Sequence, residues 1–137
     1  MNDKERILKK MEKVREYLSL IRSIEKECLE RFESDPIYRG ALLHYLYLTA
    51  DSCVALAQMM IRFRELGIPQ SYQEAIEMLG DRGLLPPDFA YDFARIAGLR
   101  NLLAHGYERV KKDLVCEEIL PRLREVEIFL GELEKHL

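Results

Sequence analysis

Four polar residues of chemically useful types lie within the run Leu-Arg-Asn-Leu-Leu-Ala-His-Gly-Tyr, which begins at Leu99. They are Arg100, Asn101, His105 and Tyr107. An arginine supplies a permanent planar cation that suits phosphate groups, and a histidine exchanges protons near neutral pH. Arg100 and His105 are therefore a minimal set for cleaving RNA without a metal ion. The arginine would stabilise charge on phosphorus while the histidine moves protons on the 2′-hydroxyl or the leaving oxygen.

The spacing of this pair limits what a single chain can do. Arg100 and His105 are five positions apart, which is about 140° around a regular helix. They converge if the helix ends near Ala104, as Gly106 permits, or if two copies of the chain meet across a dimer. For an arbitrary sequence, the commoner explanation is an arginine paired with a carboxylate and a histidine that caps a helix C-terminus.

The run resembles the R-x4–6-H-x-Y signature of HEPN domains. Its full sequence, Leu-Arg-Asn-Leu-Leu-Ala-His-Gly-Tyr, resembles the HepT-like toxin family in particular. The order of the expected helices also fits, so the resemblance covers almost the whole chain. It implies the toxin of a two-gene toxin–antitoxin system, a metal-independent endoribonuclease that needs no cofactor. The implied assembly is a homodimer whose two motifs line a shared cleft. The implied partner is a nucleotidyltransferase antitoxin, and the implied substrate is RNA.

The same resemblance assigns roles to the motif residues. Arg100 and His105 would be the catalytic pair, and Asn101 would help to order them. Tyr107 would receive AMP from the antitoxin, which would block the cleft by bulk and negative charge. The alternative is a non-catalytic helical module that binds nucleotide or RNA and partners a nucleotidyltransferase. A third possibility is a purely structural partner that stabilises such an enzyme without any affinity for RNA.

One carboxylate stands out in an apolar stretch. Asp51 is the only formal charge within residues 40–61, and a buried carboxylate is costly unless it is paired. We expect it to pair with Arg100 and so to fix the guanidinium group. HepT-like chains usually carry a glutamate at about this place, so the shorter Asp51 leaves this pairing open.

Three further residues are candidates for lining the cleft. His44 and Tyr47 lie on the same helical face as Asp51, seven and four positions before it. Arg109 belongs to a local group of basic residues around the motif. Polar residues on a helix face are more often satisfied core groups than parts of a site.

Composition and periodicity predict an all-α protein with a single domain over residues 1–137. The net charge is −3, so no global basic field attracts nucleic acid, and a polyanion needs a local patch. The apolar residues recur at helical spacing and predict helices over residues 3–32, 36–66, 71–79, 87–104 and 113–137, the last kinked at Pro121. Four long helices and one short one favour an antiparallel bundle. The apolar second helix needs contact on several sides, which a dimer supplies well.

The remaining features suggest a cytoplasmic protein. Cys28, Cys53 and Cys116 are scattered through apolar helical patterns, which predicts neither a disulfide framework nor a zinc site and suits a reducing compartment. The carboxylates show no metal-ligand spacing. The charged N-terminus has no signal-peptide core. Residues 40–61 are long enough to span a membrane, but Asp51 near the middle favours a buried bundle helix.

Overall fold

The computed structural model describes residues 1–137, and every regular element is helical. Helix α1 (Asp3–Ile24) begins after Asn2, whose side chain accepts a hydrogen bond from the backbone N–H of Glu5. A 3-10 turn (Glu25–Glu27) separates α1 from the short α2 (Cys28–Arg31). The helix predicted over residues 3–32 is thus present with one irregular turn. The buried residues of α1 form one stripe at spacings of three and four: Ile7, Met11, Val14, Leu18 and Ile21.

Helix α3 (Pro36–Phe63) is the central element of the bundle. The Asp35 side chain caps it by accepting hydrogen bonds from the N–H groups of Ile37 and Tyr38, at 3.1 and 3.0 Å. α3 is the one helix long and apolar enough to cross a membrane by length and composition. Because α1, α4 and α6 pack against it and 56% of its apolar window is buried, it serves as a core helix here.

Four helices follow α3, where three were predicted. Helix α4 (Tyr72–Asp81) starts at the predicted cap, with the Ser71 hydroxyl accepting from the N–H of Glu74 at 3.0 Å. The prediction of one continuous helix over residues 87–104 is wrong. The structure has two helices there, α5 (Pro87–Phe93) and α6 (Ile96–His105). At this break the Phe93 ring stacks on Phe129 of the last helix, with centroids 4.7 Å apart.

The C-terminal segment is irregular before it becomes a regular helix. Residues Leu114–Ile119 form a π-helical turn and Leu120–Arg122 a 3-10 turn, after which α7 (Arg124–Glu134) continues. The interruption predicted at Pro121 is confirmed, since proline cannot donate a backbone hydrogen bond. The π-helical turn was not predicted.

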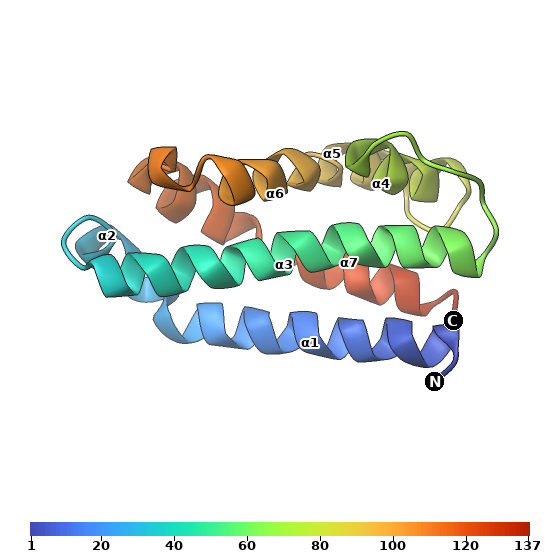
Figure 1. Cartoon of the computed structure of the whole chain (residues 1–137), viewed down its shortest axis with the longest axis horizontal. Helices are drawn as coiled ribbons and strands as arrows, with labels where there is room; N and C mark the ends of the chain where they lie inside the picture. Colours follow the sequence, from blue (N-terminus) through green and yellow to red (C-terminus); the bar gives the residue numbers. More distant parts are fainter.

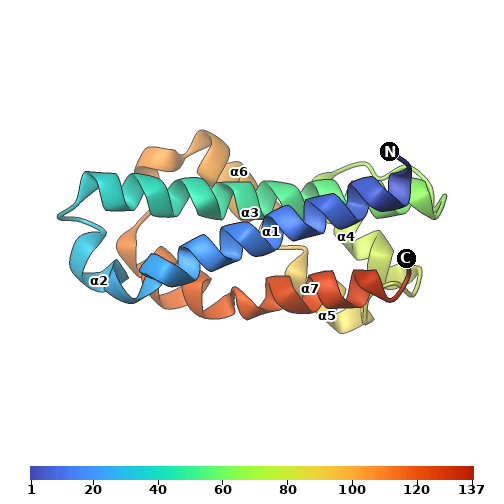
Figure 2. The same ribbon diagram turned by 90° about the horizontal axis from the view of Figure 1, so that it is seen from below.

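The helices form an antiparallel bundle, as predicted. α1, α3, α6 and α7 alternate in direction, and the two termini lie at the same end (Figure 1). α7 lies beside α1 (Figure 2), and Arg22 on α1 pairs with Glu127 on α7 at 3.3 Å. One cluster of buried hydrophobic residues joins α1, α3, α4, α5, α6 and α7. Within it, α6 lies antiparallel to α3, which brings the motif against the face of α3 that carries Asp51.

The prediction for the cysteines is wrong for two of the three. Cys28 and Cys116, 88 positions apart, form a disulfide with their Cα atoms 5.6 Å apart. The pairing could not be read from the sequence because it depends on α2 packing against the π-helical turn. Cys53 is free and buried, and burial raises the pKa of its thiol.

Candidate active site

Arg100 lies on the side of α6 that faces α3, and it makes the ion pair expected from the sequence. Its Nε donates to Oδ1 of Asp51 at 2.9 Å, and its Nη1 donates to Oδ1 of Asn101 at 3.2 Å. The hydrogen bond to Asp51 raises the pKa of Arg100. Asp51 is 41% exposed, against 18% for Arg100, so the carboxylate is not the buried charge that the apolar stretch suggested. The pair therefore orients the guanidinium more than it stabilises the fold.

Two tyrosine rings also hold the Arg100 side chain. The guanidinium carbon lies 5.7 Å from the ring centroid of Tyr47 on α3 and 5.2 Å from that of Tyr72 on α4. Both distances are within the range of a cation–π interaction. Tyr47 was proposed from its helical face. Tyr72 was missed, because it shows in the sequence only as the residue after a helix cap.

His105 is the last residue of α6 and is exposed. The helix ends one residue beyond Ala104, so both Arg100 and His105 still lie on α6 and face directions about 140° apart. No hydrogen bond or ion pair joins them. The helix ends at Gly106, whose N–H donates to the carbonyl of Leu102 at 2.7 Å. A Cβ at Gly106 would lie 3.2 Å from that oxygen and 3.0 Å from a Leu102 methyl, so this turn favours glycine.

Tyr107 begins a 3-10 turn (Tyr107–Arg109) directly after the helix end. The residue is 40% exposed, and its hydroxyl lies beside Gly40 of α3, 3.6 Å from where a Cβ on that glycine would be. The side chain of Arg39 reaches the carbonyl of Val110 at 3.5 Å. These contacts place Tyr107 against the start of α3 and leave its ring accessible.

One face of α3 spans the distance between these groups. Gly40, His44, Tyr47 and Asp51 follow one another at spacings of three and four. Since α3 and α6 are antiparallel, the first of them faces Tyr107 and the last faces Arg100. His44 therefore lies between the two. It is exposed, its ring rests edge-on against Tyr45 with centroids 5.3 Å apart, and it makes no hydrogen bond to a motif residue.

Residues 7–133 match the family model described as ribonuclease HepT-like. The chain belongs to the HepT-like ribonuclease family. It is 24% identical over 119 residues to a Shewanella oneidensis protein named mRNA nuclease HepT, covering 80% of this chain and 90% of that one. Its fold matches a tri-AMPylated S. oneidensis HEPN toxin solved with the MNT antitoxin, with a TM-score of 0.85, 23% identity and coverage of 98% and 99%. It also matches YutE, a cytosolic Bacillus subtilis protein, with a TM-score of 0.84, 17% identity and coverage of 98% and 90%.

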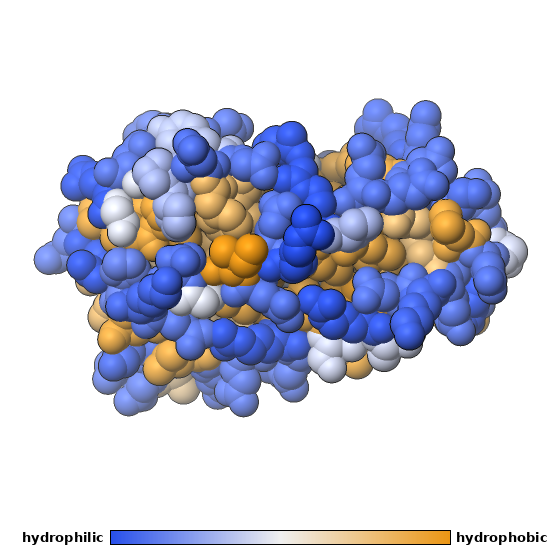
Figure 3. All heavy atoms as spheres, turned by 180° about the vertical axis from the view of Figure 1, so that it is seen from behind, coloured by the Kyte–Doolittle hydropathy of each residue, from blue (hydrophilic) through white to orange (hydrophobic).

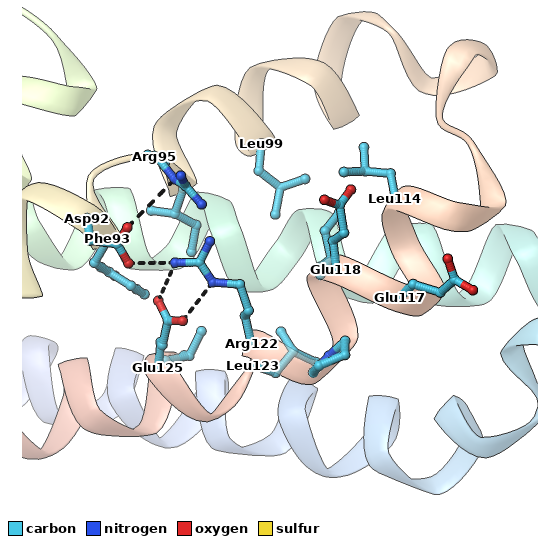
Figure 4. Close-up of a pocket in the computed structure, with 14 residues that line it drawn as sticks. Asp92, Phe93, Arg95, Leu99, Leu114, Glu117, Glu118, Arg122, Leu123 and Glu125 are labelled. Carbon is cyan, nitrogen blue, oxygen red and sulfur yellow. Dashed lines mark hydrogen bonds and ion pairs between the residues drawn. The ribbon is translucent and has the colours of Figure 1, made fainter.

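One cavity of this HepT-like chain is lined by Ile96 and Leu99 of α6 but not by Arg100. It holds about 500 Å³ between α6, the π-helical turn and the start of α7, and no motif residue lines it. Arg122 points into it and is bound by Asp92 at 2.5 Å and by Glu125 at 2.7 Å (Figure 4). The face of the molecule that carries α7 shows hydrophobic patches among hydrophilic side chains (Figure 3).

The basic residues around the motif differ in how far they are neutralised. Lys112 pairs with Glu33 at 3.3 Å, and Arg95 lies 3.9 Å from Asp92. Arg109 is exposed and forms no ion pair. No hydrogen bond or ion pair joins it to Arg100 or His105, so its lining role stays a prediction. No group of three or more His, Cys, Asp or Glu side chains is placed to hold a metal ion.

Proposed function

We propose that this chain is the toxin of a two-gene toxin–antitoxin system, a metal-independent endoribonuclease that works in the cytoplasm. The observation that carries the proposal is the set of contacts that the Arg100 guanidinium makes. One end of its guanidinium is held by Asp51 and its faces lie near two tyrosine rings, while Nη1 meets only a neutral amide. A cation fixed in this way still has donors to offer to a phosphate. His105 and Tyr107 are exposed on the next turns of the same segment.

The chemistry follows from the groups present. His105 removes the proton from a ribose 2′-hydroxyl as that oxygen attacks the adjacent phosphorus. The bond from phosphorus to the 5′ oxygen breaks, and this oxygen takes up a proton as it leaves. The products are a 2′,3′-cyclic phosphate and a 5′-hydroxyl. Arg100 stabilises the extra negative charge on the phosphoryl oxygens in the transition state.

A homodimer would bring together the Arg100 and His105 side chains that α6 keeps apart within one chain. Because α6 continues through His105, Arg100 and His105 of one chain face directions about 140° apart. A second copy can bring its own His105 to the first copy's Arg100. Asn101, Asp51, His44, Tyr47 and Arg109 would then border the shared cleft.

The proposed control point is Tyr107, which a nucleotidyltransferase antitoxin would modify with AMP. Its exposed phenol accepts the transfer: the Tyr107 oxygen bonds to the α-phosphorus of ATP, pyrophosphate leaves, and the phenolic proton is released. Each AMP adds one negative charge beside Arg100 and His105. RNA would then be excluded by repulsion as well as by bulk.

Cleavage of RNA by pure protein in EDTA tests the proposal. We expect wild type to cut and both Arg100→Ala and His105→Ala to be inactive. Tyr91→Ala is the control for loss of an exposed side chain, since the Tyr91 hydroxyl donates to Asp81 and not to a motif residue. Mixing the two inactive variants should restore part of the activity, because a mixed dimer holds one complete site. Binding of RNA without cleavage by wild type would favour the non-catalytic module instead. Affinity for the nucleotidyltransferase with none for RNA would favour a structural partner.

The modification has its own test. Incubation with the cognate nucleotidyltransferase and labelled ATP should add AMP to wild type and abolish its cleavage. Tyr107→Phe should take no label and should keep cutting RNA in the presence of the enzyme and ATP. Label that persists in Tyr107→Phe would show that another side chain is the acceptor.

A further inference from the structure

A second cavity opens beside the motif, on the exposed side of α6. It holds about 430 Å³ and is lined by residues from the start of α4 and the middle of α6: Ser71, Tyr72, Gln73, Ala97, Gly98 and Asn101. A Cβ added at Gly98 would meet no atom within 4 Å. No other part of the protein therefore packs over α6 at Gly98, and the cavity is open to solvent there.

The side chains of this cavity suit a nucleobase. Tyr72 packs on the Arg100 guanidinium yet stays 37% exposed, and exposed aromatic rings are the usual platforms for unpaired bases. The Asn101 oxygen accepts from Arg100, so its NH₂ group remains free to donate. The Gln73 nitrogen donates to Glu77 at 3.0 Å, so its oxygen remains free to accept. A stacking surface with a donor and an acceptor beside it matches the face and the edge of a base.

The cavity lies on the same face of α6 as His105. Gly98, Asn101 and His105 are all exposed and follow one another at spacings of three and four. Asn101 and Gly98 are about 6 and 10 Å from His105 along the helix axis. That span corresponds to about two or three stacked nucleotides.

We propose that Tyr72, with the cavity beside it, binds an unpaired base of single-stranded RNA close to the bond that is cut. The inference rests on the proposed function, since it describes part of that enzyme's substrate site. Stacking on Tyr72 would also seat the strand next to Arg100, because the ring contacts the guanidinium. Tyr72 would thus contribute to the binding of RNA, while Arg100 and His105 carry the reaction.

Binding of a short fluorescent RNA, blocked by a 2′-deoxy sugar at the cleavage site, tests this pocket. A series of oligonucleotides, each with one abasic position, locates the base. We expect Tyr72→Ala to weaken binding about tenfold and Tyr72→Phe to change it by less than about twofold, since the ring provides the stacking. Tyr91→Ala, which removes another exposed tyrosine, should not change it. One abasic position should weaken binding to wild type about tenfold but cause no further loss in Tyr72→Ala.

The contrary outcomes are distinct. If every abasic position weakens wild type and Tyr72→Ala equally, Tyr72 contacts no base and the inference fails. If Tyr72→Ala lowers kcat on a cleavable RNA with unchanged affinity, the ring only holds Arg100 in place, and the inference also fails. If wild type cuts no RNA, the proposed nuclease function is wrong, while the abasic series still decides whether Tyr72 binds a base.

Discussion

Arg100 on α6 and Arg122 in the 3-10 turn before α7 are both held by carboxylates, yet they differ in the donors that they leave free. Arg122 on the cavity side is bound by two carboxylates, Asp92 and Glu125, so its charge is neutralised within the protein. Arg100 on the α3 side has one carboxylate partner and retains donors. An arginine saturated by acidic groups fastens elements together, whereas one that is anchored at one end can bind a phosphate. The larger cavity is therefore not the better candidate for the reaction.

The sharpest test of this contrast replaces each arginine in turn. Arg100→Ala should lower kcat/KM for RNA by about 10²- to 10³-fold, because it removes a fixed group that stabilises transition-state charge. Arg122→Ala should change kcat/KM by less than about twofold. Cleavage assays at matched concentrations of folded protein measure both. A comparable loss in Arg122→Ala would mean that the two sides of α6 act together.

The disulfide on the cavity side should matter for stability and not for catalysis. Cys28→Ser opens a link between residues 88 positions apart, so we expect the free energy of unfolding to fall by about 2–4 kcal/mol. Urea denaturation without reductant measures the loss, and wild type in reductant should behave like the variant. The folded variant should cut RNA at the wild-type rate, and a clear loss of rate would contradict the separation of the two sides. Rapid thiol alkylation in freshly lysed cells would show which form the cytoplasm holds.

A smaller effect is expected from the carboxylate that orients Arg100. Asp51→Asn should lower kcat about tenfold and leave KM nearly unchanged, because the amide still occupies the site but binds the guanidinium less firmly. In a double-mutant cycle, Asp51→Asn should cost almost nothing once Arg100 is alanine. Additive losses would show that Asp51 acts independently of the arginine.

The smallest effect should come from the corresponding change on the cavity side. Asp92→Asn removes one of two partners from Arg122, and both side chains are partly exposed. Ion pairs of this kind contribute about 1 kcal/mol or less. We expect denaturation midpoints close to wild type and unaltered cleavage. Loss of activity here, with Asp51→Asn unaffected, would reverse the roles assigned to the two sides.

The helix boundaries divide into those that local chemistry sets and those that packing sets. Asp35 and Ser71 start helices by accepting hydrogen bonds from backbone N–H groups three positions later, so the sequence predicts these helix starts well. No proline and no side-chain cap marks the break between α5 and α6 around Ala94. There Phe93 stacks on Phe129, which lies 36 positions further along the chain, so the contact at the break is not local.

For the site, the sequence by itself determined the types of residue: a cation, a proton carrier and a phenol at set intervals, with one acidic residue in an apolar helix. Their placement along α6 and α3 follows from helical period, which is a local property. Only the tertiary structure decided that Asp51 meets Arg100, that Tyr72 covers the same guanidinium, and that Cys28 reaches Cys116. These contacts join residues far apart in the chain. They depend on how whole helices pack, which no short window of sequence encodes.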